Sequence, residues 1–145
     1  MISSVLNERC RLGILKLRGI AVSKLEGKVI QYILMKNKQL HTLDLSFCKA
    51  ELPEHFEFFM QKFDNFCNIR FLTMESMQPD LSTSIEVLGE ALALNTKLEC
   101  LILRDNKIKW IPYSNFWQYL IPNKTLRKIN VAKTELTDKV LTKLV

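Results

Sequence analysis

The chain has 145 residues, of which 48% are hydrophobic, and it carries a formal net charge of +6 at pH 7. This length suffices for one domain that buries about two thirds of the surface exposed by the unfolded chain. No run approaches the ~18 consecutive apolar residues of a membrane-spanning helix, and residues 1–10 lack the apolar core of a signal peptide. We therefore expect an intracellular protein, in the cytoplasm, without a membrane span.

The first predicted strand begins at Leu12, and a helix is expected soon after it. Ser23 and Glu26 have the spacing of a capping box, in which each side chain accepts a hydrogen bond from the backbone N–H of the other residue. Apolar residues then recur at helical spacing. The predicted apolar face of this helix consists of Leu25, Val29, Ile30, Ile33 and Leu34.

The second strand begins at Leu40, and Pro53 is suited to the first turn of the helix that follows. The predicted core residues of that helix are Phe56, Phe59, Met60 and Phe63. Phe58 falls outside this stripe. It is either a second contact on the helical side or a residue that the neighbouring helix partly covers.

Two further strand–helix pairs follow, with strands that begin at Ile69 and Leu98. Thr83 and Glu86 predict a second capping box, and Ser114 is expected to cap the next helix, which Pro122 ends. The apolar face of the third helix is predicted to contain Ile85, Leu88, Leu92 and Leu94. A last strand begins at Leu126.

The five strand segments repeat one pattern at nearly constant spacing. They begin at residues 12, 40, 69, 98 and 126, which are 28, 29, 29 and 28 residues apart. In the fourth segment Asn106 is placed to bond backbone groups of a loop that has left the strand ladder. Cys48 and Thr134 hold the same position in the second and fifth segments. We expect the five segments to be adjacent strands.

The segment from Leu98 to Ile108 has apolar residues at relative positions 0, 3, 5 and 10 and asparagine at position 8, the pattern of leucine-rich repeats. With a helix in each unit, and with the turns that begin at Asn95 and Asn123, the chain resembles the ribonuclease-inhibitor-like subfamily. The resemblance implies an α/β fold, a right-handed curved solenoid of about five strand–helix units. A parallel sheet would form its concave face and helices its convex face.

The resemblance also predicts one domain over residues 1–145. Each unit of a repeat protein buries its apolar edge against a neighbour, and terminal units need polar caps. Neither end has a clear cap, so we expect a fragment of a longer solenoid or one that a partner protein covers.

Alternation along the strands assigns four residues of each unit to the accessible concave face. The full set is Ile14, Lys16, Arg18, Gly19, Thr42, Asp44, Ser46, Phe47, Phe71, Thr73, Glu75, Ser76, Cys100, Ile102, Arg104, Asp105, Lys128, Asn130, Ala132 and Lys133. Its middle combines apolar residues with charges, as protein interfaces do. The predicted partner contacts are Phe47, Phe71, Thr73, Glu75, Ile102 and Arg104. The alternative is that these are ordinary strand-surface residues.

We therefore expect a non-catalytic protein–protein interaction module, a scaffold or adaptor that works as a subunit of a larger assembly. No catalytic motif occurs, His41 and His55 are the only histidines, and we predict no catalytic residue, cofactor or metal. The four cysteines have no metal-ligand spacing and are expected to be reduced thiols.

Two other functions stay open at this point. The resemblance admits a regulator that activates hydrolysis by a small GTPase. The basic ends of the arc admit RNA or ribonucleoprotein binding, although Asp44, Glu75 and Asp105 interrupt the basic residues in its middle.

Overall fold

The computed structural model describes residues 11–64, 67–78, 80–110 and 115–138. Within these ranges five strands form one parallel sheet in the order β1-β3-β5-β6-β7. Their bounds are β1 Ile14–Lys16, β3 Thr42–Asp44, β5 Phe71–Thr73, β6 Cys100–Ile102 and β7 Lys128–Asn130. The predicted α/β class with a parallel sheet is confirmed.

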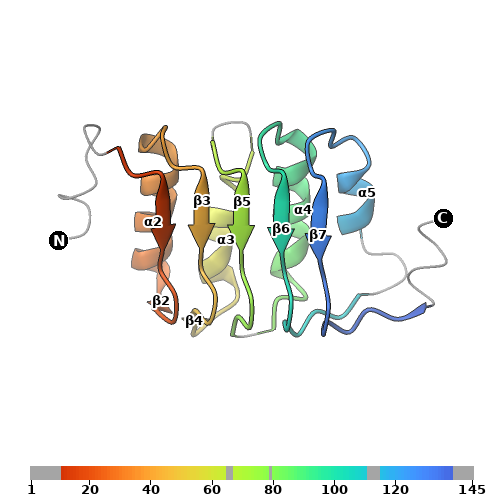
Figure 1. Ribbon diagram of the computed structural model, residues 1–145. Coiled ribbons are helices and arrows are strands. Elements are labelled where there is room, and N and C mark those ends of the chain that lie inside the picture. The colour runs from red at the N-terminus through yellow and green to blue at the C-terminus, as the bar shows by residue number, and fades with distance from the viewer. Residues whose placement is uncertain (1–10, 65–66, 79, 111–114, 139–145) are drawn as a thin grey trace.

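Helices lie along one side of this sheet and leave the other side open (Figure 1). Their bounds are α2 Lys24–Lys36, α3 Glu54–Met60, α4 Ser84–Leu94 and α5 Phe116–Leu120. A second parallel sheet consists of two short strands, β2 (Ala21–Val22) and β4 (Lys49–Ala50). β2 lies between β1 and α2, and β4 lies between β3 and α3. Each strand of the large sheet is therefore adjacent to the next one along the chain, with the intervening helix on one face.

The register of the large sheet confirms the predicted spacing. Leu43 pairs with Leu72, Leu72 with Leu101, and Leu101 with Ile129, which are steps of 29, 29 and 28 residues. Since side chains alternate across a strand, these residues all point to the helix side. Leu43, Leu72 and Leu101 are fully buried there and form the centre of the core.

Where β3, β5, β6 and β7 begin, two consecutive N–H groups share one carbonyl of the neighbouring unit, and at β3 that carbonyl is the one of Gly13, which accepts the N–H groups of His41 and Thr42. The carbonyl of His41 accepts the N–H groups of both Arg70 and Phe71, and the carbonyl of Arg70 likewise accepts those of Glu99 and Cys100. The carbonyl of Glu99 repeats the arrangement with residues 127 and 128. Each shared carbonyl therefore joins both the first residue of a strand and the residue before it to the neighbouring unit.

The first of the two predicted capping boxes is confirmed and the second is wrong. Ser23 and Glu26 cap each other at the start of α2. Thr83 precedes α4 but makes no capping hydrogen bond through its side chain, because its own backbone is already helical. Glu86 instead accepts the N–H of Asn115 at 3.1 Å, and so joins α4 to the segment before α5.

The phenylalanine prediction for α3 is confirmed. Phe56, Phe59 and Phe63 are fully buried, and their rings meet edge to face with centroids 5.9 and 6.3 Å apart. By contrast, Leu25 and Leu94 are 67% and 62% exposed, so their assignment to the core is wrong. They lie in the first turn of α2 and at the last residue of α4, where the described neighbours do not cover them.

The prediction for Asn106 is also confirmed. Its amide nitrogen donates to the carbonyls of Met74 and Leu103, and its carbonyl oxygen accepts the N–H of Met77 at 2.8 Å. At the same position, the thiol of Cys48 donates to the carbonyl of Leu17 at 3.0 Å. These buried polar groups join successive loops. The predicted cap Ser114 lies outside the described residues.

Candidate protein-binding surface

The side of the large sheet that faces away from the helices is the candidate surface, called here the open sheet face (Figure 1). It consists of the outward strand residues and the residues that follow each strand. Most of the predicted set is accessible. Asp44 and Ser46 are buried, contrary to prediction, because their side chains bond the backbone: Asp44 accepts the N–H of Ser46, and Ser46 accepts the N–H of Glu75.

Two phenylalanines stand out on the open sheet face. Phe47 is 42% exposed and Phe71 is 40% exposed. The guanidinium carbon of Arg18 lies 5.0 Å from the centre of the Phe47 ring, and that of Arg70 lies 5.5 Å from the centre of the Phe71 ring. Cation–π contacts of this kind attract the guanidinium to the face of the ring and so restrict the motion of an exposed ring. Neither arginine was predicted as a contact residue.

The structure brings the other four predicted contact residues together. Thr73 pairs in register with Ile102 across β5 and β6. Two residues further along, Arg104 Nη1 lies 3.4 Å from Glu75 Oε1. The backbone N–H of Phe47 donates to the carbonyl of Glu75, which joins the loop after β3 to this group. All four side chains are partly exposed.

The backbone of Phe47 has an unusual conformation. Its φ is 63°, in the left-handed region, which costs a residue with a β-carbon about 1–2 kcal/mol. The equivalent residues of the other units, Gly19, Ser76, Asp105 and Lys133, share this conformation. A bulky, exposed aromatic residue at such a site is an outlier of the kind that is often associated with function.

Charges on the open sheet face are paired across neighbouring strands. Arg18 Nη1 lies 3.5 Å from Asp44 Oδ2, beside the Arg104–Glu75 pair. Basic and acidic groups thus alternate in the middle of the face. A continuous line of cations, as a nucleic-acid backbone requires, does not cross this part of the surface.

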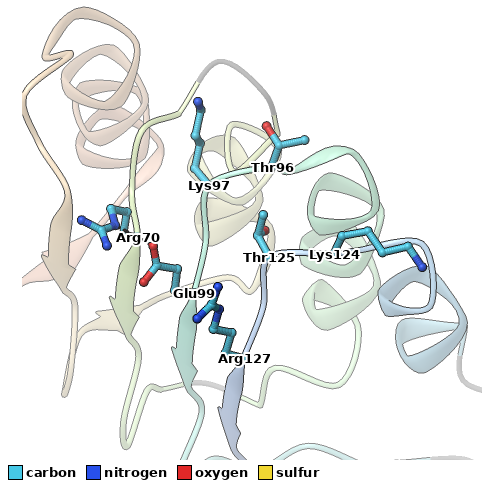
Figure 2. Close-up of a pocket in the computed structure, with 7 residues that line it drawn as sticks. All are labelled: Arg70, Thr96, Lys97, Glu99, Lys124, Thr125 and Arg127. Atoms are coloured by element: carbon cyan, nitrogen blue, oxygen red, sulfur yellow. Dashed lines mark hydrogen bonds and ion pairs between the residues drawn. The ribbon is translucent and has the colours of Figure 1, made fainter.

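A pocket of about 200 Å³ adjoins the open sheet face where β5, β6 and β7 begin (Figure 2). Arg70, Glu99 and Arg127 form a row across its floor, and Lys97 and Lys124 come from the loops that lead into β6 and β7. The sequence analysis missed this site, because alternation along the strands left these positions out of the accessible set. Their signal was the sequence of opposite charges at one position of successive units.

The floor of the pocket is organised by an ion pair. Arg70 Nε donates to Glu99 Oε1 at 2.8 Å. This hydrogen bond, together with the charges of Arg70 and Arg127, lowers the pKa of Glu99 below its usual value. The same bond raises the pKa of Arg70. Glu99 is therefore a carboxylate at neutral pH, held between two guanidinium groups.

Metal-ligating side chains and cysteine thiols, which form reactive sites in other proteins, form no such site among the described residues. In the described ranges, no three or more His, Cys, Asp or Glu side chains are arranged to hold a metal ion. Cys48, Cys67 and Cys100 are free thiols, and burial raises the pKa of Cys67 to about 11. No helix among the described residues is long and apolar enough to cross a membrane. Cys10 lies outside the described residues.

Comparison with known proteins identifies a fold but no family. No family model matches the chain, and no curated protein matches its sequence. Among solved structures, the chain is similar to "Leiomodin-1 Actin-Binding Site 2 (ABS2)" with a TM-score of 0.78 and 17% sequence identity. The match covers 99% of this chain and 84% of that one.

This finding corrects the family assignment made from the repeat pattern. The structural neighbour is an actin-binding site of leiomodin, so the assignment to ribonuclease-inhibitor-like leucine-rich-repeat solenoids is wrong. The physical reason is that equal spacing of apolar residues determines only which strands pair and in what register. Many sequences have such spacing, so it does not identify a family. The GTPase-activating alternative depended on that assignment and is withdrawn. At this level of identity the similarity establishes the arrangement of strands and helices alone.

Proposed function

We propose that this chain is a non-catalytic protein-interaction module that binds its partner through the open sheet face and acts as a scaffold or adaptor. The observation that supports this most directly is the pair of exposed phenylalanines, Phe47 and Phe71, each beneath an arginine guanidinium. Aromatic residues and arginine carry much of the binding energy of protein interfaces. Cation–π contacts also orient the rings before the partner arrives, which lowers the entropy cost of binding.

We infer that this face is concave. Strands in a sheet lie about 4.8 Å apart, whereas packed helices lie about 8–10 Å apart. A stack with sheet on one side and helices on the other therefore bends toward the sheet. A concave face surrounds a convex partner and buries more area than a flat one of equal width.

Actin is the first partner to test, because the structural neighbour is titled as an actin-binding site. The support for this candidate is similarity of fold. The experiment is to measure binding of the purified chain to monomeric actin by fluorescence anisotropy and to filaments by co-sedimentation. If neither form binds, actin is rejected, and affinity purification followed by mass spectrometry supplies the next candidate.

Whichever partner binds, substitution of the proposed contacts tests the face itself. Phe71→Ala and Ile102→Ala should each weaken binding by more than ~1 kcal/mol, because each removes apolar contact area at the centre of the face. Leu25→Ala is the matched control, since Leu25 is an exposed apolar residue on the helical side. Unchanged affinity in both open-face variants would contradict the proposal.

A further inference from the structure

The pocket at the start of β5, β6 and β7 is rich in cations. Arg70, Lys97, Lys124 and Arg127 line it, against the one carboxylate of Glu99. Two threonines from the same connecting loops complete the lining (Figure 2). The pocket thus concentrates positive charge and hydroxyl groups in a concavity of about 200 Å³. Such a lining selects an anionic ligand.

The cations of the pocket are spread rather than convergent. Glu99 lies between the arginines on neighbouring strands, and the ammonium groups of Lys97 and Lys124 point away from it in different directions (Figure 2). Because neighbouring strands are about 4.8 Å apart, the backbones that carry Arg70 and Arg127 are about 10 Å apart. A site for one phosphate instead directs several donors at a single point. Here the place between the two arginines is already occupied by the carboxylate of Glu99.

Spread cations match several carboxylates carried on one chain. In an extended peptide, side chains on the same side recur about every 7 Å. Two or more Asp or Glu residues of a peptide can therefore reach different cations of this pocket. A lone anion cannot do so.

The pocket is also continuous with the open sheet face. Arg70 takes part in both, because its guanidinium lies over the Phe71 ring and its Nε donates to Glu99. Arg70 and Phe71 are consecutive residues whose backbone N–H groups share one acceptor, the carbonyl of His41. A partner chain that covers Phe71 therefore lies beside the pocket.

We propose that this pocket binds an acidic segment of the protein partner, a stretch with two or more Asp or Glu side chains next to an apolar group that contacts Phe71. This inference rests on the proposed function and adds the chemistry of the partner to it. Arg127, Lys97 and Lys124 bind the carboxylates of that segment. The ion pair with Glu99 holds Arg70 in position between the two parts of the interface.

The test uses a fluorescein-labelled peptide of eight glutamates as the probe, measured by anisotropy against the full chain at low and moderate salt. The pocket variant carries three substitutions of exposed residues: Lys97→Gln, Lys124→Gln and Arg127→Gln. The control variant removes the same charge from exposed lysines elsewhere: Lys28→Gln, Lys49→Gln and Lys109→Gln. Circular dichroism verifies that both variants fold.

We expect the pocket variant to bind the peptide at least about tenfold more weakly than the control variant, because local charges steer and hold an acidic chain. Backbone amide NMR shifts caused by the peptide should be largest at residues 96–99 and 124–127. Equal weakening of both variants would overturn the proposal, since it would mean that net charge alone attracts the peptide. Displacement of the peptide by millimolar inorganic phosphate at the same residues would also overturn it, in favour of a single-oxyanion site.

Failure of this inference is distinguishable from failure of the proposed function. The peptide assay needs no partner, and Phe71→Ala leaves the lining of the pocket in place. If the pocket variant loses the peptide while Phe71→Ala and Ile102→Ala retain full partner affinity, the open-face proposal fails and the pocket stands. If those two variants lose partner affinity and the pocket variant retains the peptide, the pocket inference fails alone.

Discussion

Single residues on the open sheet face combine structural and binding roles. Arg70 illustrates this best, because it lies over the Phe71 ring, pairs with Glu99 and supplies a carbonyl to two amides of the next strand. Phe47 keeps a left-handed backbone that glycine adopts in the first unit. Both residues lie just outside a strand, where the alternation of side chains along a strand does not determine which way a side chain points. The placement of Arg70 depends on the backbone at the start of β5 and that of Phe47 on the turn after β3, and both are properties of the folded backbone.

At this scale we predict that Arg70→Gln raises the pKa of Glu99 toward its usual value. The hydrogen bond from Arg70 is the main cause of the lowered pKa, and its loss removes that stabilisation of the carboxylate. Carboxyl-carbon NMR titration of Glu99 in the two proteins measures the shift. Arg104→Gln, which removes a guanidinium paired with Glu75 instead, is the control and should leave the Glu99 titration unchanged.

The same change has a consequence for stability with a definite sign. Because the pKa of Glu99 is lower in the folded state than in the unfolded state, its contribution is present above the unfolded pKa. That contribution is lost as the pH falls through the folded pKa. The unfolding free energy of the Arg70→Gln protein should therefore depend less on pH in this acidic range. An identical acid dependence would contradict the assignment.

Secondary-structure elements are held together mainly by the apolar residues that alternate on the helix side of the strands. Leu101 of β6 is fully buried, whereas Ile129, its partner in register on β7, is partly exposed. The two residues have equivalent places in their strands. They differ because β6 has a strand on each side and β7 has a described neighbour on one side alone.

This difference predicts unequal costs for the same truncation. Leu101→Ala should destabilise the fold by about 2–5 kcal/mol, since it removes buried contacts and leaves a cavity. Ile129→Ala should cost less than about 2 kcal/mol, because part of the side chain is already in water. Urea denaturation followed by circular dichroism gives both values. Equal losses would contradict the burial difference between β6 and β7.

The molecule as a whole is a row of strand–helix units in which contacts run mainly between neighbours. The inner strands β3, β5 and β6 each pair with the strands of the units before and after them along the chain, and α2, α3, α4 and α5 contact one another in the same order. Stability in such a row depends on interfaces between adjacent units. The inner units, with two interfaces each, should open less often than the outer ones.

Native-state hydrogen exchange tests this prediction. The N–H groups of Leu17 and Met74 donate to neighbouring strand carbonyls at 2.8 and 2.9 Å, so their hydrogen bonds are comparable. Met74 is fully buried in an inner unit, whereas Leu17 is partly exposed in the first described unit. We expect the Met74 amide to be protected at least about tenfold more strongly, because local opening frees Leu17 without unfolding the rest. Equal protection of both amides would indicate fully cooperative opening instead.

The sequence by itself determined the strands, their order and their register. Apolar residues recur every 28 or 29 residues, and burial of one side of each strand permits one alignment, since a shift by one residue would expose every inward side chain. The sequence also determined the roles of Asn106 and of the Ser23–Glu26 box, because both depend on local spacing. It identified Phe47, Phe71 and Ile102 as outward residues for the same reason.

The tertiary structure alone decided which polar residues meet. The pairing of Arg70 with Glu99, 29 residues away, requires that β5 and β6 be adjacent and in register, which brings the side chains at the starts of these strands together. The burial of Asp44 and Ser46 and the exposure of Leu25 and Leu94 depend likewise on what a neighbouring unit covers. Periodicity reports which side of an element is apolar. It carries no information about how side chains of different units are placed relative to one another. The pocket and the arginine–phenylalanine contacts depend on that placement.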